Sequence, residues 1–311
     1  MKAPHHCAGL LLFGTTVAPA TLARMHQQST HRIRVDLAYD GTDYHGWARQ
    51  PGLPTIQATV EDGLSVIFRQ PVATTVAGRT DAGVHAANQV IHFDVPTELW
   101  VELPGHHPSR PAEAALVSKL NGVLAKESGA IRIRSARVVP KGFDARFSPI
   151  SRSYRYLVAL DDPDPLTRHF TYHHRKPLVV PRMVEETRGL AGLHDFGAFC
   201  KPRPGATTIR TLQEFFIEQD EPVLTIHLTA DAFCHHMVRA LVGALLRVGD
   251  GSRDPGWLRD RLAVPVRDSN MVIAPAHGLI LDRVMYPADD QVEQRAAQTR
   301  AKRDPTILTC D

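Results

Sequence analysis

The pattern that most constrains the fold is a predicted strand followed directly by a predicted helix. Residues 33–39 alternate between apolar and mostly charged side chains with a period of two, which is typical of a half-exposed strand. Asp40 and Gly41 then signal a turn. Thr55 is a suitable N-cap for a helix over residues 56–67, in which apolar residues recur at spacings of four, four and three. A chain with this succession is expected to pack helices against a sheet.

The same two patterns recur along the rest of the chain. Alternation predicts further strands at residues 75–76, 91–95, 131–133, 154–160 and 224–228. The spacing of apolar residues predicts helices over 112–125, after Pro181 and over 237–248. We therefore expect an α+β fold made of two similar halves, residues 31–150 and residues 151–287.

The two ends of the chain lack such patterns. Residues 1–30 contain only a short apolar run that Pro19 soon follows, which disfavours a secretory signal peptide. We expect a disordered extension here and a working start at Met25. Residues 288–311 are polar and mixed in charge, and we expect them to form a frayed tail.

The composition excludes several classes of protein. A chain of 311 residues, 43% of them hydrophobic, is long enough to form one large core or two ordinary ones. No stretch reaches the roughly 18 to 20 uncharged apolar residues of a membrane-spanning helix, so we expect no membrane partner. The net charge of +3 says little about partners.

The cysteines indicate the compartment. They form no C-x-x-C pair, which argues against a disulfide framework and against a zinc ribbon. The four are Cys7, Cys200, Cys234 and Cys310. We therefore expect a reducing, cytoplasmic location.

Positive charge is concentrated in residues 131–155, where seven basic residues and aromatic rings accompany a single acidic residue, Asp144. The basic residues are Arg132, Arg134, Arg137, Lys141, Arg146, Arg152 and Arg155. Cations and flat rings together are typical of RNA-binding surfaces, and no module for the DNA major groove is visible. A second basic loop, residues 201–205, adds to this. RNA is the favoured partner class, and a solvated basic sheet edge is the alternative interpretation.

The segment Ala-Gly-Arg-Thr-Asp-Ala-Gly-Val-His, residues 77–85, has the composition of a functional loop. Its two glycines allow a ligand to approach the backbone closely, and Asp81 stands two residues from Arg79 in a short polar turn. The alternative is an Asx-type turn in which Arg79 only braces Asp81. Asp81 and His85 have a spacing that metal ligands use, but no third ligand is suitably spaced, so we expect no metal.

This segment resembles the active-site motif of the TruA family of tRNA pseudouridine synthases. Further stretches resemble the family in the same order along the chain, over residues 32–287. They are residues 39–47, 143–148, 153–156, 194–196, 209–211, 233–239, 274–276 and 286–287. The chain departs from the family pattern at Ala48, at Ala240 and after Leu124, which bears on fine specificity more than on activity.

The resemblance implies a cofactor-free isomerase that converts uridine to pseudouridine at positions 38–40, in the anticodon stem-loop of tRNA. It implies a homodimer in which the two α+β halves of each chain share a mixed, mainly antiparallel sheet with a central RNA-binding cleft. By resemblance Asp81 is the catalytic residue, and it acts either as a nucleophile or by steering a deprotonation at C2′.

Three further residues are expected to bind the substrate. By resemblance Arg79 assists the flipping of the target base, and Tyr154 stacks on the uracil and is a candidate proton relay. Arg239 lies in an apolar helix, where a buried guanidinium requires an anionic partner, and the resemblance supplies Asp81. Adjacent histidines point to different sides of a helix, so of His235 and His236 we expect one to pack in the core and the other to contact phosphate.

Two other functions compete with this interpretation. A non-catalytic RNA-binding protein or chaperone of the same fold would be favoured if Asp81 were replaced, and it is present. A glycosidase acting on nucleosides normally has a second catalytic carboxylate near the first, and none stands in the motif. The sequence does not determine which tRNAs or positions are modified, or whether other RNAs are substrates.

Overall fold

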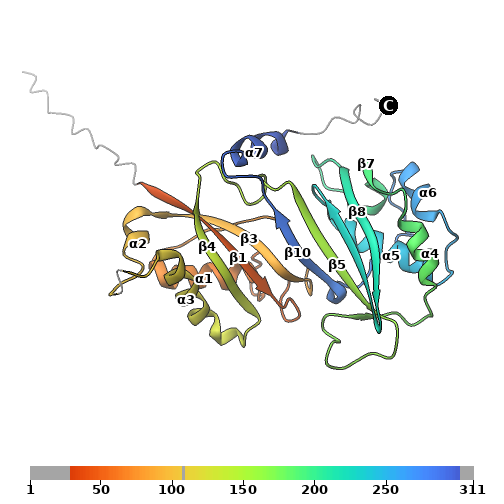
Figure 1. Ribbon diagram of the computed structural model, residues 1–311, viewed down its shortest axis with the longest axis horizontal. Helices are drawn as coiled ribbons and strands as arrows, with labels where there is room; N and C mark the ends of the chain where they lie inside the picture. Colours follow the sequence, from red (N-terminus) through yellow and green to blue (C-terminus); the bar gives the residue numbers. More distant parts are fainter. Residues whose placement is uncertain (1–28, 107–108, 302–311) are drawn as a thin grey trace, which may run out of the picture.

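A computed structural model describes residues 29–106 and 109–301. The expected disordered extension, residues 1–30, therefore falls almost entirely outside the described residues. One sheet of ten strands runs through the molecule in the order β4-β1-β3-β10-β5-β9-β8-β7, with β2 beside β3 and β6 beside β5 (Figure 1). The strands are β1 (Thr30–Tyr39), β2 (Thr75–Val76), β3 (His85–Pro96), β4 (Ile131–Val139), β5 (Ser151–Ala159), β6 (Tyr172–His173), β7 (Gly192–Asp195), β8 (Ile209–Asp220), β9 (Val223–Ala230) and β10 (Leu279–Met285).

Helices pack beside the strands of both halves of the sheet. They are α1 (Ile56–Phe68), α2 (Thr97–Val101), α3 (Ala112–Val123), α4 (Val180–Thr187), α5 (Met237–Gly249), α6 (Trp257–Ala263) and α7 (Val292–Arg300). Short 3₁₀ helices occupy Leu124–Glu127, Gly197–Phe199 and Ala276–Gly278. Figure 1 shows α1 to α3 beside the strands of the first half and α4 to α6 beside those of the second. The expected α+β fold is confirmed.

The sheet is mixed and mainly antiparallel, as expected. Only the pairs β10–β3 and β5–β6 are parallel among the named strands. The chain returns after α6 to place β10 between β3 and β5, so the last described strand joins the strands of residues 30–139 to those of residues 151–230. The sequence patterns did not predict this strand.

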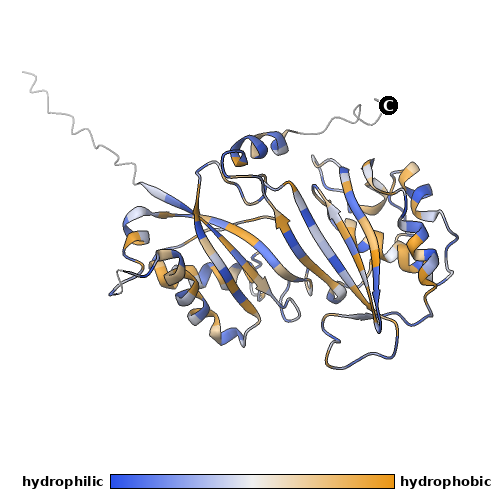
Figure 2. Ribbon diagram, viewed as in Figure 1, coloured by the Kyte–Doolittle hydropathy of each residue, from blue (hydrophilic) through white to orange (hydrophobic). Residues whose placement is uncertain are grey.

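The core follows the periodicities of the sequence. On β1, Ile33, Val35 and Leu37 are fully buried, and Figure 2 shows apolar and polar residues alternating along the strands. The helix α1 begins as expected, because the Thr55 side chain accepts a hydrogen bond from the Ala58 N–H. Its Gly63 allows close packing on α3, since a Cβ at Gly63 would lie 2.9 Å from Leu120 Cδ1.

Two expectations about the chain ends and the cysteines are corrected. The tail after residue 287 is not frayed throughout, because Val292 and Ala296 are buried in helix α7. Cys200 and Cys234 form a disulfide with Cα atoms 5.7 Å apart, since the fold brings together segments 34 residues apart in the chain. No helix among the described residues has the length and apolar character needed to cross a membrane.

Candidate active site

A cavity of about 620 Å³ lies where the first half of the chain meets the second half, near the middle of the sheet. One side is residues 77–81, which we call the N-terminal wall, and the other is residues 231–239, which we call the C-terminal wall. Tyr154 of β5 and residues of α7 also line it. The volume is in the range of small-molecule pockets, roughly 300 to 1,000 Å³, and can hold a nucleobase.

Backbone packing holds the N-terminal wall. A Cβ at Gly41 would lie 2.1 Å from the Val84 carbonyl oxygen, and one at Gly46 would lie 2.8 Å from that of Thr80. Gly46 also has a φ of +88°, which favours glycine. The Trp47 N–H donates to the Thr80 carbonyl at 3.0 Å. The segment after β1 therefore supports the loop that carries Asp81 with its main chain.

His85 anchors the far end of the same loop. The Gly41 N–H donates to His85 Nδ1 at 3.1 Å, and Asp40 Oδ1 lies 3.0 Å from the same nitrogen. On the other side of the ring, His85 Nε2 lies 3.1 Å from the His277 carbonyl oxygen. Only 3% of His85 is exposed. This residue is a structural link between the loop and the 3₁₀ helix before β10, and it does not face Asp81 as a second metal ligand would.

Asp81 points from the N-terminal wall toward cationic and imidazole groups of the C-terminal wall. Arg239 Nη1 donates to Asp81 Oδ2 at 3.0 Å, and Arg239 Nε donates to the Ala274 carbonyl at 2.8 Å. The contact expected between Arg239 and Asp81 is therefore present. The Asp81 side chain remains 29% exposed, so its carboxylate is accessible from the cavity.

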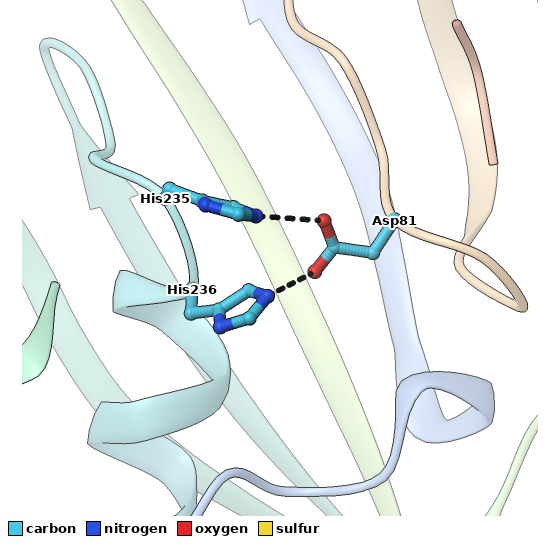
Figure 3. A group of neighbouring side chains, drawn as sticks. All are labelled: Asp81, His235 and His236. Carbon is cyan, nitrogen blue, oxygen red and sulfur yellow. Dashed lines mark ion pairs between the residues drawn. The ribbon is translucent and has the colours of Figure 1, made fainter. Parts of the chain in front are cut away.

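His235 and His236 both face the same carboxylate (Figure 3). His235 Nε2 lies 3.6 Å from Asp81 Oδ1, and His236 Nε2 lies 3.5 Å from Oδ2. The expectation that the two rings point to different sides of a helix is wrong, because both residues precede α5 and His236 has a left-handed φ of 69° as its N-cap. Burial lowers the pKa of both imidazoles, and for His235 the nearby Arg203 contributes further.

Asp81, His235 and His236 could in principle hold a metal ion, since each offers one ligand atom within 4.8 Å of the others. The surrounding charge opposes this. Arg239 already occupies Asp81 Oδ2, and Arg267 is close enough to both histidines to lower their pKa. The guanidinium groups of Arg239 and Arg267 would repel a metal cation at this position. The arrangement therefore suits an anionic ligand better than a metal ion.

Tyr154 and Arg79 both line the cavity, as expected of substrate-binding residues. Tyr154 lies edge-on to Phe233, with ring centroids 5.1 Å apart, and burial raises the pKa of its phenol to about 12. Arg79 is exposed, and its guanidinium makes no hydrogen bond or ion pair with the described residues. A guanidinium in this state is available to an incoming phosphate or base.

The basic segment 131–155 does not form one surface. Of its seven cations, only Arg146 and Arg152 line the cavity. Arg152 is buried and donates to the carbonyls of Ala77 at 2.9 Å, Arg146 at 2.7 Å and Asp231 at 2.8 Å, so it braces both walls. The others lie elsewhere: Arg132 and Arg134 on the edge strand β4, Lys141 beside Thr30, and Arg137 and Arg155 paired with Asp289 and Asp282.

Comparison with known proteins places these features in a family context. A family model described as tRNA pseudouridine synthase matches residues 187–287. The chain is 48% identical to tRNA pseudouridine synthase A of Streptomyces avermitilis over 286 residues, covering 90% of this chain and 96% of the relative. It is 49% identical to the protein of that name from Frankia casuarinae over 279 residues, covering 88% and 96% of the two chains. The corresponding match in Leifsonia xyli is 48% over 288 residues, covering 90% and 99%.

Proposed function

The chain belongs to the tRNA pseudouridine synthase A family, and we propose that it isomerises uridine at positions 38–40 of the tRNA anticodon stem-loop with Asp81 as its catalytic residue. Isomerisation of uridine to pseudouridine in tRNA is its activity, since relatives 48–49% identical over nearly their whole length are tRNA pseudouridine synthases. The positions and the residue roles are the part we propose.

The reaction needs few chemical groups. The bond between N1 and C1′ breaks, the uracil rotates while held in place, and a bond forms between C5 and C1′. The proton on C5 leaves and N1 gains one, so substrate and product have the same atoms. One carboxylate suffices for this, either by attacking the substrate as a nucleophile or by steering the removal of a proton from C2′.

A single observation carries the assignment to Asp81: it is a partly exposed carboxylate in the cavity that Arg239 holds at 3.0 Å. Asp231 is the other acidic residue of the lining, and its Oδ1 accepts hydrogen bonds from the Thr211 and Ala232 N–H groups. A glycosidase would use two carboxyl groups on either side of the scissile bond. The engagement of Asp231 with backbone amides therefore favours the isomerase.

The remaining groups suit the handling of a flipped nucleotide. Extrusion of a base costs roughly a few kcal/mol, and a free cation beside the site can stabilise the displaced strand. We assign this role to Arg79. Tyr154 would contact the uracil face, and its high phenol pKa favours stacking over proton acceptance near neutral pH. His235 and His236 would limit the motion of the Asp81 carboxylate from the opposite side.

The proposed partner follows from the family resemblance, and the proposed location follows from the activity. We propose that the chain works as a homodimer, without cofactor or metal, in the cytoplasm where tRNA is modified. The spacing of the cysteines does not support a reducing compartment, because Cys200 and Cys234 form a disulfide. The location rests on the substrate instead.

The test is to map pseudouridine by carbodiimide-stopped reverse transcription on tRNA treated with the purified protein. Stops at positions 38–40 are expected, and tRNAs without uridine at those positions should give none. Stops only at other uridines would contradict the proposed positions. Tight binding of tRNA without any stop would favour the non-catalytic RNA-binding protein.

A further inference from the structure

Helix α7 forms part of the cavity wall, although it lies beyond the residues that resemble the family motifs. Arg295, Gln298 and Thr299 line the same cavity as Arg79, Asp81 and Tyr154. In Figure 1, α7 lies above the middle of the sheet, near the ends of β5 and β10. The end of the chain is therefore placed beside the reaction centre.

The helix is attached firmly to the segment between β4 and β5. Arg300 pairs with Asp144 at 2.7 Å, and its guanidinium lies 4.9 Å from the ring centroid of Phe147. The Ser148 hydroxyl donates to the Val292 carbonyl at 2.9 Å. A Cβ at Gly142 would lie 2.5 Å from Glu293 Cβ, so the absence of a side chain there allows the close approach. These contacts make α7 a fixed wall.

The side of α7 that faces the cavity presents hydrogen-bond donors and one positive charge. Arg295 Nε donates to the Pro149 carbonyl at 3.1 Å, and among the described residues the two terminal nitrogens of its guanidinium have no hydrogen-bond partner. Gln298 is exposed, so its amide can reach a ligand. No aromatic residue lies on α7 itself. The nearby Phe147 ring also lines the cavity, but the guanidinium groups of Arg146 and Arg300 already lie 5.0 and 4.9 Å from its centroid.

We propose that α7 binds the sugar–phosphate backbone of the tRNA beside the flipped uridine, through Arg295 and Gln298. This rests on the proposed function, because it takes tRNA as the ligand of the cavity. Thr299 lines the same wall, but its hydroxyl already donates to the Arg295 carbonyl at 3.0 Å. Arg203 lines the C-terminal side of the cavity, so cations stand on both sides of the space that the strand would enter. Guanidinium and amide donors are the groups that commonly position a nucleic-acid backbone.

The test compares charges placed on two faces of the same helix. Gln298→Glu puts a carboxylate at the cavity wall, whereas Ala297→Glu puts one on an exposed residue that does not line the cavity. Gln298→Lys adds a cation at the first position. Binding of tRNA is measured for all three as a function of salt, with the unfolding temperature as the check on folding.

We expect Gln298→Glu to weaken tRNA binding by about fivefold at low salt, because a carboxylate near a phosphate is repelled. Gln298→Lys should bind at least as tightly as the parent, with a salt dependence steeper by up to about one released counterion. Ala297→Glu should bind within about twofold of the parent, since exposed charges farther away are screened.

Equal binding by Gln298→Glu and Ala297→Glu would overturn the proposal, and so would weaker binding by Gln298→Lys. The parent protein separates this failure from failure of the proposed function. If it forms pseudouridine while these charge changes have equal effects, only the role of α7 is wrong. If it forms none, the proposed function is wrong.

Discussion

The two walls of the cavity are built in different ways. The N-terminal wall is held by its main chain, because Gly41 and Gly46 bring one backbone segment against another and His85 ties the end of the loop. The C-terminal wall acts through long side chains, chiefly Arg239 with His235 and His236. The N-terminal wall holds the Asp81 carboxylate in a fixed position, and the C-terminal wall supplies the charged and polar side chains around that carboxylate.

This difference indicates how each wall should respond to substitution. Backbone packing has little freedom to relax, so a small added group should cost folding stability. Side-chain contacts can be altered without moving the backbone, so changes there should cost activity more than stability. The following predictions test that division, from the largest expected effect to the smallest.

Asp81→Asn should abolish pseudouridine formation while tRNA binding persists. The amide keeps the shape of the side chain but can neither attack nor accept a proton as a carboxylate does, so the single-turnover rate should fall on the order of a thousandfold or more. Binding and conversion are measured on the same preparation. Conversion at near the parent rate would exclude Asp81 as the catalytic residue.

Gly41→Ala should destabilise the protein by about 3 kcal/mol, because the new methyl group would meet the Val84 carbonyl at 2.1 Å. The matched control is Gly78→Ala on the N-terminal wall itself, where the nearest atom to an added Cβ is 3.8 Å away. Denaturant unfolding of both variants gives the comparison. Equal stabilities would show that main-chain contact does not hold this wall.

Arg239→Lys should fold normally and convert bound tRNA about ten- to a hundredfold more slowly. The guanidinium holds Asp81 and the Ala274 carbonyl at once, and a lysine ammonium cannot reproduce that planar geometry. Single-turnover conversion at saturating tRNA measures the effect, with the unfolding transition as the control. A rate near that of the parent would mean that this pair does not position the carboxylate.

Tyr154→Phe should reduce conversion by less than about tenfold. The ring and its edge-on contact with Phe233 remain, and a phenol with a pKa of about 12 is neutral between pH 6 and 9 in any case. The rate should be measured across that pH range. A loss of more than a hundredfold would show that the hydroxyl transfers a proton in the reaction.

The sequence predicted the elements whose periodicity survives in the structure. Residues 33–39 alternate because one face of β1 is buried, and α1 begins at its expected cap. β10 was missed because Leu279, Ile280 and Leu281 are all buried, which removes the alternation. Helix α7 was missed because Val292 and Ala296 alone are buried among polar residues.

The candidate site was predictable where a short motif carries it. Asp81 and Arg239 were identified from their motifs, and the contact between them is present. The shared orientation of His235 and His236 depends on the left-handed backbone at His236, which no side-chain pattern records. The pairing of Cys200 with Cys234 depends on the fold, since a sequence separation of 34 residues does not reveal spatial proximity.

The central position of β10 has a consequence for biosynthesis. On the ribosome, residues 279–285 emerge after the other strands that the structure describes, yet they fill the gap between β3 and β5. Until then both of those strands present open edges, which are prone to pairing with other chains. The nascent protein would therefore remain exposed to aggregation until late in translation.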